Sequence, residues 1–215
     1  MARVKICGIN TTEAIEAAAA ADWIGFVFFP PSPRAVTPHQ AAALSKAGPA
    51  GPKRVGLFVD PTDTAITETL GTIPLDVLQV HSSMERAAEL RVRFGLPVWY
   101  AAGVHSAADL PLAAPGLDAI LLDAKAPPGA SLPGGNALPF DWTVLHRWAA
   151  PVPWLLAGGL TPGNVAEAIQ VSQAAAVDVS SGVERTRGVK DPELILAFIR
   201  AARSANRRFV TPGQP

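Results

Sequence analysis

Eight short apolar runs, separated by longer alanine-rich segments, restrict the fold of this 215-residue chain more than any other feature. Strands that alternate with helical segments predict a parallel sheet with helices outside it, and runs that are apolar almost throughout are typical of strands buried on both faces. Eight such units predict an α/β fold of the (β/α)8 type, a TIM barrel, which has ~250 residues on average. The runs are Arg3–Gly8, Trp23–Phe29, Arg54–Asp60, Val77–His81, Val98–Gly103, Ala119–Ala124, Trp154–Gly159 and Ala176–Ser181.

An open, doubly wound sheet is the competing fold. It has fewer strands as a rule, and it often carries a glycine-rich fingerprint after the first strand. Here Gly8 is followed by Ile9 and Asn10, so that fingerprint is absent. We therefore expect a single barrel domain over residues 1–209, with residues 210–215 as a loose tail.

A helix is expected after each strand. Proline at a first-turn position supports the second helix, and Ser82 with Glu85 fits a capping box for the fourth. The eight expected starts are Thr11–Glu13, Thr37–Pro38, Asp60–Asp63, Ser82–Glu85, His105–Ser106, Phe140–Trp142, Leu160–Pro162 and Lys190–Pro192.

Composition excludes several classes of function. Basic and acidic residues number 18 each, so nothing favours nucleic acid or an anionic membrane as a partner. One cysteine cannot form an internal disulfide or a thiolate metal site. No signal peptide and no apolar run of membrane-spanning length is visible. We expect a cytoplasmic protein, monomeric or homodimeric, that uses no metal or organic cofactor.

Candidate catalytic residues stand where barrel enzymes carry them, at the C-terminal ends of strands. Cys7 shares a strand face with Lys5, and as a thiolate it could act as a base. The plainer interpretation is a small buried apolar side chain. Asp123 follows four apolar residues and could act as an acid, or it could simply cap the next turn.

Candidate binding residues lie in neighbouring loops. Gly158-Gly159 and Ser180-Ser181-Gly182 follow the seventh and eighth strands, the usual phosphate site of this fold, although two tight turns would look the same. Arg34, after three prolines, could bind a carboxylate or lie solvated at the surface.

Two further polar residues belong to the strands. Lys5 and Asp178 are expected to pair, since they lie inward on strands that are neighbours in a closed barrel. His81 has no second ligand at metal-binding spacing, so we interpret it as a polar neighbour of the site or as a structural histidine.

These residues resemble the phosphoribosylanthranilate isomerase family, (β/α)8 enzymes of tryptophan biosynthesis. The matching segments occur in order along the chain, and the first and the Val177–Glu184 segments are the most specific. They are Val4–Ile9, Gly25–Pro30, Ser32–Arg34, Val55–Val59, Leu75–His81, Leu121–Asp123, Phe140–Trp142, Leu156–Val165, Val177–Glu184 and Gly188–Pro192.

The resemblance implies a cofactor-free Amadori rearrangement of N-(5′-phosphoribosyl)anthranilate. In that reaction Asp123 would be the general acid, Cys7 the general base, and Arg34 the partner of the anthranilate carboxylate. Gly158, Gly159, Ser180, Ser181 and Gly182 would hold the phosphate, with Asp178 assisting, as this likeness further implies.

The chain departs from the family pattern at two places. Ser82–Glu85 replaces a glycine and acidic residues after His81, and Ala137 and Leu138 replace a glycine and a basic residue in the loop after the sixth strand. The second change leaves open a barrel that binds phosphate ligands with little or no turnover. A histidine-pathway isomerase of the same fold is a further alternative, but it would favour a carboxylate where Cys7 stands.

Overall fold

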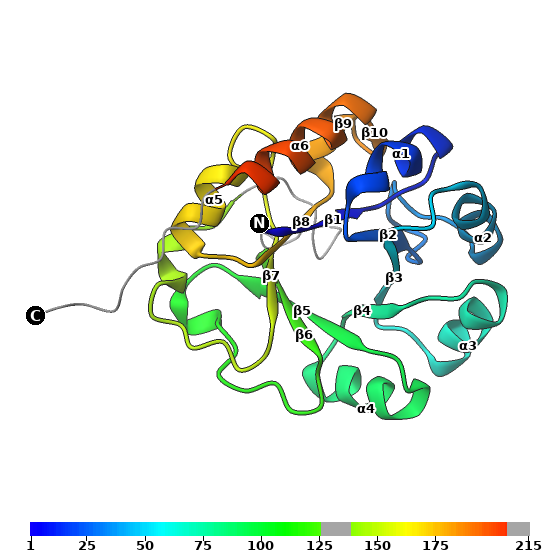
Figure 1. The fold of residues 1–215 in the computed structure, drawn as a ribbon. Helices are drawn as coiled ribbons and strands as arrows, with labels where there is room; N and C mark the ends of the chain where they lie inside the picture. Colours follow the sequence, from blue (N-terminus) through cyan, green and yellow to red (C-terminus); the bar gives the residue numbers. More distant parts are fainter. Residues whose placement is uncertain (126–138, 206–215) are drawn as a thin grey trace, which may run out of the picture.

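The computed structural model describes residues 1–125 and 139–205, and these form a closed barrel of eight parallel strands in the order β1 to β8 (Figure 1). The α/β barrel predicted from the sequence is thereby confirmed. The predicted tail, residues 210–215, lies outside the described residues. The strands are β1 (Arg3–Cys7), β2 (Trp23–Val27), β3 (Lys53–Val59), β4 (Val77–His81), β5 (Val98–Val104), β6 (Ala119–Ala124), β7 (Trp154–Leu156) and β8 (Ala176–Val179).

Alternation along the strands creates two apolar layers. Side chains that point inward, including Trp23, Val77, Trp99 and Leu121, form one buried cluster inside the barrel. Side chains that point outward, such as Ile6, pack in a second cluster beneath the helices. Because both faces of each strand are covered, the strands read as nearly continuous apolar runs, which is why they were visible in the sequence.

Six α-helices surround the strands among the described residues (Figure 1). Five of the six helices have a side-chain cap at the N-terminus, at Thr11, Thr37, Thr62, Ser83 and Asp191. Thr37 and Gln40 form a complete capping box, and Pro38 occupies the first helical position between them. The helices are α1 (Thr12–Ala17), α2 (Pro38–Ala47), α3 (Asp63–Thr72), α4 (Met84–Phe94), α5 (Val165–Ser172) and α6 (Pro192–Ser204).

The expected cap of α4 was wrong by one residue. Ser83, not Ser82, accepts the hydrogen bond from the backbone N–H of Arg86. No helix of the described part of the chain has the length and apolar content needed to cross a membrane.

The expected fifth and sixth helices are replaced by single 3₁₀ turns, η2 (Ala107–Asp109) and η3 (Trp142–Leu145). Proline disrupts a helix because it lacks the N–H donor and clashes with the preceding turn. Pro111 lies two residues after the end of η2, Pro115 follows in the same connection, and Pro151 lies after η3. A short antiparallel pair, β9 (Glu184–Thr186) and β10 (Val189–Lys190), follows β8 and was not anticipated.

The predicted pair between Lys5 and Asp178 is confirmed. The two residues are register partners on β1 and β8, and Lys5 Nζ lies 2.8 Å from Asp178 Oδ1. The lysine side chain is fully buried and the aspartate side chain is 8% exposed. Each charge therefore depends on the other, because an unpaired charge in this interior would be costly.

Replacing Lys5 with methionine is expected to lower the free energy of unfolding by about 3–5 kcal/mol, since Asp178 would keep a buried charge without its partner. Urea unfolding followed by circular dichroism measures this change. The double variant Lys5→Met/Asp178→Leu is the control and should recover much of the loss, because it removes both charges. A loss below about 1 kcal/mol in the single variant would contradict this account of the pair.

Candidate active site

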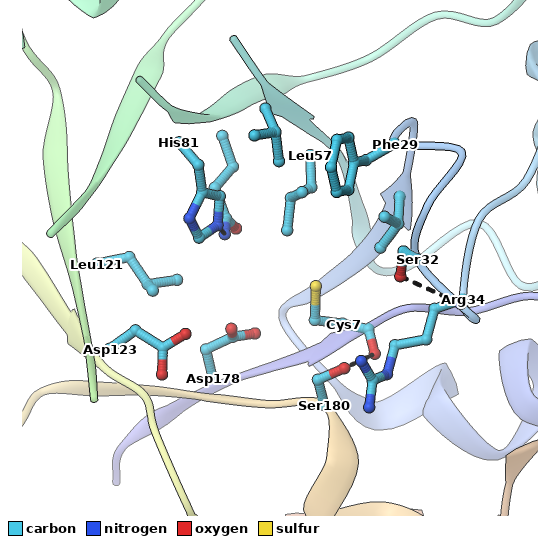
Figure 2. Close-up of a pocket in the computed structure, with 13 residues that line it drawn as sticks. Cys7, Phe29, Ser32, Arg34, Leu57, His81, Leu121, Asp123, Asp178 and Ser180 are labelled. Carbon is cyan, nitrogen blue, oxygen red and sulfur yellow. Dashed lines mark hydrogen bonds between the residues drawn. The ribbon is translucent and has the colours of Figure 1, made fainter. Parts of the chain in front are cut away.

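A pocket opens at the C-terminal ends of the strands, where barrel enzymes place their chemistry (Figure 2). It contains about 520 Å³ of empty space, a volume that includes space open to solvent. Its apolar lining includes the side chains of Phe29, Leu57 and Leu121. Its polar lining residues are Cys7, Ser32, Arg34, Gln79, His81, Asp123, Asp178 and Ser180.

Cys7 is the last residue of β1, so its thiol is the uppermost inward side chain of that strand. The neighbouring position on β2 is Gly25, where an added Cβ would lie only 3.0 Å from the sulfur and 3.2 Å from Lys5 Nζ. A glycine at this position therefore leaves room for the thiol and the ammonium side by side. The exposed fraction of Cys7 is 3%.

Burial raises the pKa of the Cys7 thiol, and the nearby cations Lys5 and Lys190 offset only part of this effect. Asp178 acts in the same direction as burial, because a carboxylate disfavours a second negative charge beside it. The side chain is therefore a neutral thiol at neutral pH in the free protein. With a raised pKa, only a small fraction of Cys7 is a thiolate at neutral pH, but that thiolate is a stronger base than an unperturbed one.

A pH titration of thiolate absorbance near 240 nm tests this protonation state. The chain has one cysteine, so subtracting the spectrum of a Cys7→Ser variant isolates the signal of this thiol. Since burial disfavours the charged form, we expect the thiolate to appear only above the ordinary thiol pKa of about 8.5. A thiolate already formed at pH 7 would contradict the raised pKa.

Asp123 stands near the end of β6, and its carboxylate lines the same pocket as the thiol of Cys7 (Figure 2). Its Oδ1 accepts a hydrogen bond of 2.8 Å from the backbone N–H of Ala124, which helps to fix the carboxylate. Gly158 lies against it: an added Cβ there would overlap the Ala124 nitrogen and approach Asp123 Oδ1 to 3.0 Å. A larger residue at position 158 would displace the carboxylate.

The small-residue loops after β7 and β8 form a second, adjoining pocket. Asp123, Asp178 and Ser180 line both pockets, so the two lie side by side. Gly158 and Gly159 both have positive φ, a conformation that favours glycine, and an added Cβ at Gly182 would overlap the carbonyl oxygen of Leu160. The remaining lining residues are Ala157, Gly158, Gly159, Leu160, Val179, Ser181 and Gly182. Backbone packed this closely suits the binding of an anion such as phosphate.

Arg34 reaches the first pocket, but it is not the loosely presented side chain that three prolines suggested. Its Nε and Nη2 donate to the two carboxylate oxygens of Glu184 at 2.6 and 3.0 Å. Lys190 Nζ donates to the same carboxylate at 2.8 Å and also to the carbonyl oxygen of Ser180. The side chains of Glu184 and Lys190 are 4% and 0% exposed.

Sequence reasoning did not single out Glu184 or Lys190, although both lie within the segments that carried the family resemblance. The signal available in the sequence was Glu184, a charged residue only a few positions after the apolar run that forms β8. What the sequence lacked was the contact itself, which joins the loop after β2 to the short β9–β10 pair some 150 residues later.

His81 lines the pocket from the end of β4. Burial, together with the positive charge of Lys5, lowers the pKa of His81 to about 4, so the imidazole is neutral at neutral pH. Its Nε2 lies 3.5 Å from Nε2 of the buried Gln79. The interpretation of His81 as a polar neighbour of the site agrees with this position, and the described residues contain no group of three or more acidic, histidine or cysteine side chains arranged to hold a metal ion.

The structure thus brings all the predicted site residues to one end of the barrel. Cys7, Asp123, Arg34 and Asp178 line the first pocket, and the glycines and serines of the two loops line the second. The altered loop segment, residues 134–138, lies outside the described residues. A thiol, a carboxylate and a buried guanidinium beside a pocket of small residues can move protons on a small anionic ligand without a cofactor.

Known proteins are similar to this chain over nearly its whole length. The family model described as N-(5′-phosphoribosyl)anthranilate isomerase matches residues 4–201. The enzyme of that name from Acidiphilium cryptum is 54% identical over 207 residues, which are 95% of this chain and 100% of the relative.

Solved structures agree with the sequence matches. TrpF from Jonesia denitrificans superposes with a TM-score of 0.81 at 35% identity, covering 95% of this chain and 98% of the other. A phosphoribosyl anthranilate isomerase in complex with reduced 1-(o-carboxyphenylamino)-1-deoxyribulose 5-phosphate has a TM-score of 0.76 at 33% identity, covering 94% and 99%. Barrel, pocket and matched length lead to one conclusion: this chain belongs to the N-(5′-phosphoribosyl)anthranilate isomerase family.

Proposed function

We propose that this protein converts N-(5′-phosphoribosyl)anthranilate into 1-(2-carboxyphenylamino)-1-deoxyribulose 5-phosphate, an isomerisation in tryptophan biosynthesis, with Cys7 and Asp123 as its base and acid. The observation that carries the proposal is a single pocket lined by a thiol, a carboxylate and an arginine, which adjoins a second pocket lined by small residues. Family membership supplies the substrate and the direction of the reaction.

Asp123 acts first in the proposed mechanism. Its protonated carboxyl donates a proton to the ribose ring oxygen, the bond between that oxygen and C1′ breaks, and the nitrogen lone pair forms a Schiff base. Cys7, as the thiolate, then removes the proton from C2′, and the electrons of that C–H bond neutralise the iminium as an enolamine. Tautomerisation of the enolamine to the ketone returns the protons, so the reaction needs no oxidant, reductant or cofactor.

The substrate carries two anionic groups, and the site offers a complement for each. Arg34, which lines the pocket, binds the anthranilate carboxylate through its guanidinium. The loops at Gly158-Gly159 and Ser180-Ser181-Gly182 bind the phosphate. Their small residues allow backbone N–H groups to approach it closely. Asp178, held by Lys5, lies between the two subsites because it lines both pockets.

The proposal is tested by incubating the purified protein with phosphoribosylanthranilate and following the loss of anthranilate fluorescence. We expect fluorescence loss to coincide with formation of the deoxyribulose phosphate product. Because the product is an isomer of the substrate, it is identified as a species of the same mass with a different chromatographic retention time. Retained binding of the reduced product analogue without any turnover would instead favour a phosphate-ligand-binding barrel. A matched aminoaldose phosphate from histidine biosynthesis tests the remaining alternative.

Other properties remain proposals. We propose one barrel domain over residues 1–209 and a cytoplasmic location, in keeping with a biosynthetic role. The sequence leaves monomer and homodimer open, and sedimentation of the purified protein decides between them.

A further inference from the structure

The hydrogen bonds around Glu184 leave one side chain of the cluster Arg34, Glu184 and Lys190 able to bind a ligand. Oε1 of Glu184 accepts from Arg34 Nε at 2.6 Å and from Lys190 Nζ at 2.8 Å. Oε2 accepts from Arg34 Nη2 at 3.0 Å and from the backbone N–H of Gly188 at 2.9 Å. Four donors occupy the carboxylate, which is about its full capacity.

Lys190 is also fully engaged. Its ammonium has three N–H donors, and its acceptors are Glu184 Oε1, the Ser180 carbonyl oxygen at 2.9 Å and Ser180 Oγ at 3.3 Å. Burial, and to a smaller degree the charge of Arg34, lowers the pKa of Lys190, while Glu184 opposes this change. Lys190 therefore fixes Glu184 against the phosphate-side loop and has no donor left for a ligand.

Arg34 is different, because a guanidinium has five N–H donors and two edges that each fit a carboxylate. Glu184 occupies the edge formed by Nε and Nη2. Within residues 1–125 and 139–205, no hydrogen bond engages the opposite edge, formed by Nη1 and Nη2. Arg34 lines the pocket together with Cys7 and Ser180, all three of which are labelled in Figure 2.

The charges of the cluster also favour an anion. Two buried cations, Arg34 and Lys190, share one carboxylate, so one positive charge is left over. Contacts with these cations outweigh burial and lower the pKa of Glu184, which is therefore ionised at neutral pH. A substrate carboxylate on the open edge of Arg34 would complete the pairing in this poorly solvated place.

We propose that Glu184 is a positioning residue for substrate selection: by holding Arg34 along its Nε–Nη2 edge, it fixes the Nη1–Nη2 edge toward the pocket as a bidentate receptor for the aromatic carboxylate. Glu184 itself does not line the pocket and acts only through Arg34. The inference rests on the proposed function, since it specifies how that site recognises an anthranilate rather than an unsubstituted aniline.

Two ligands and one substitution separate positioning from charge alone. The ligands are reduced 1-(2-carboxyphenylamino)-1-deoxyribulose 5-phosphate and the same molecule without the ring carboxylate. Calorimetry gives the ratio of their dissociation constants, which isolates the carboxylate subsite. Removing the negative charge with Glu184→Gln should tighten carboxylate binding if Coulomb attraction alone matters. If Glu184 instead positions Arg34, the same substitution should weaken binding of the carboxylated ligand.

We expect the wild-type protein to prefer the carboxylated ligand, and Glu184→Gln to reduce that preference by about ten- to hundredfold while the other ligand binds as before. In an Arg34→Met background, Glu184→Gln should have no further effect on the preference, because the group it positions is gone. In the isomerase assay, KM for phosphoribosylanthranilate should rise more than kcat falls.

An unchanged or increased preference in Glu184→Gln would overturn the inference, as would equal weakening of both ligands. If that variant does not fold, Glu184→Asp replaces it and is judged by the same outcomes: it keeps the buried charge but is too short to bridge Nε and Nη2 from the same backbone position. Failure of the wild-type protein to bind either ligand would overturn the proposed function instead, so the two failures are distinct.

Discussion

Replacing Cys7 with alanine is expected to reduce kcat for phosphoribosylanthranilate by about 10²–10⁴-fold, the usual contribution of a general base. The thiol is the uppermost inward group of β1 and lines the pocket, and alanine has no group that can accept the C2′ proton. Initial rates from anthranilate fluorescence measure the loss. The reduced product analogue should keep its affinity within a few-fold, because the two anion subsites are untouched.

Cys7→Ser is the matched control for shape. Its hydroxyl is nearly the size of the thiol but is a far weaker acid, so its conjugate base is not available, and we expect a loss of the same order as for alanine. The barrel should tolerate both changes, since neither adds volume beside Gly25. Near-normal kcat in either variant would contradict the role of the thiol.

Asp123→Asn is expected to reduce kcat by a similar factor of about 10²–10⁴, because the amide cannot donate a proton to the ribose ring oxygen. Asparagine is isosteric and its carbonyl oxygen can still accept the 2.8 Å hydrogen bond from the Ala124 N–H, so the end of β6 should keep its structure. Steady-state kinetics and thermal unfolding of this variant separate chemistry from stability.

Asp123→Ser is a useful second variant, since it removes the carbonyl acceptor as well. Neither asparagine nor serine can donate a proton as a carboxylic acid does. If the only role of Asp123 is proton donation, kcat should therefore be equally low in both variants. Retained turnover in Asp123→Asn, with product confirmed, would show that another group protonates the ring oxygen.

The barrel was predictable from the sequence because each strand is buried on both faces. That burial imposes runs such as Ala119–Ala124 that are apolar almost to the end, followed by a polar residue where the strand leaves the core. The Lys5–Asp178 pair followed from the same logic, since inward residues on β1 and β8 must be neighbours once the barrel closes.

The segments between the strands were predicted less well, because a helix-favouring composition can be overridden by a nearby proline. Alanine-rich sequence after β5 suggested a helix, but Pro111 limits it to the turn Ala107–Asp109. Ser82 and Ser83 are both good caps, and only the backbone geometry selects Ser83.

The arginine receptor shows the other limit. The sequence placed Arg34 near the site, yet its orientation depends on Glu184 and Lys190, which reach it only through the tertiary fold. No periodicity or motif spacing encodes which edge of a guanidinium is occupied. Contacts of this kind become visible only when both segments are placed in space.

The central claim, that Cys7 and Asp123 form the acid–base pair of an isomerase, is tested most directly by one assay. Wild-type protein, Cys7→Ala and Asp123→Asn are incubated with phosphoribosylanthranilate at equal concentration, and the loss of anthranilate fluorescence is recorded. The account predicts rapid loss with the wild-type protein and rates at least about a hundredfold lower with each variant. A wild-type rate in either variant would contradict it.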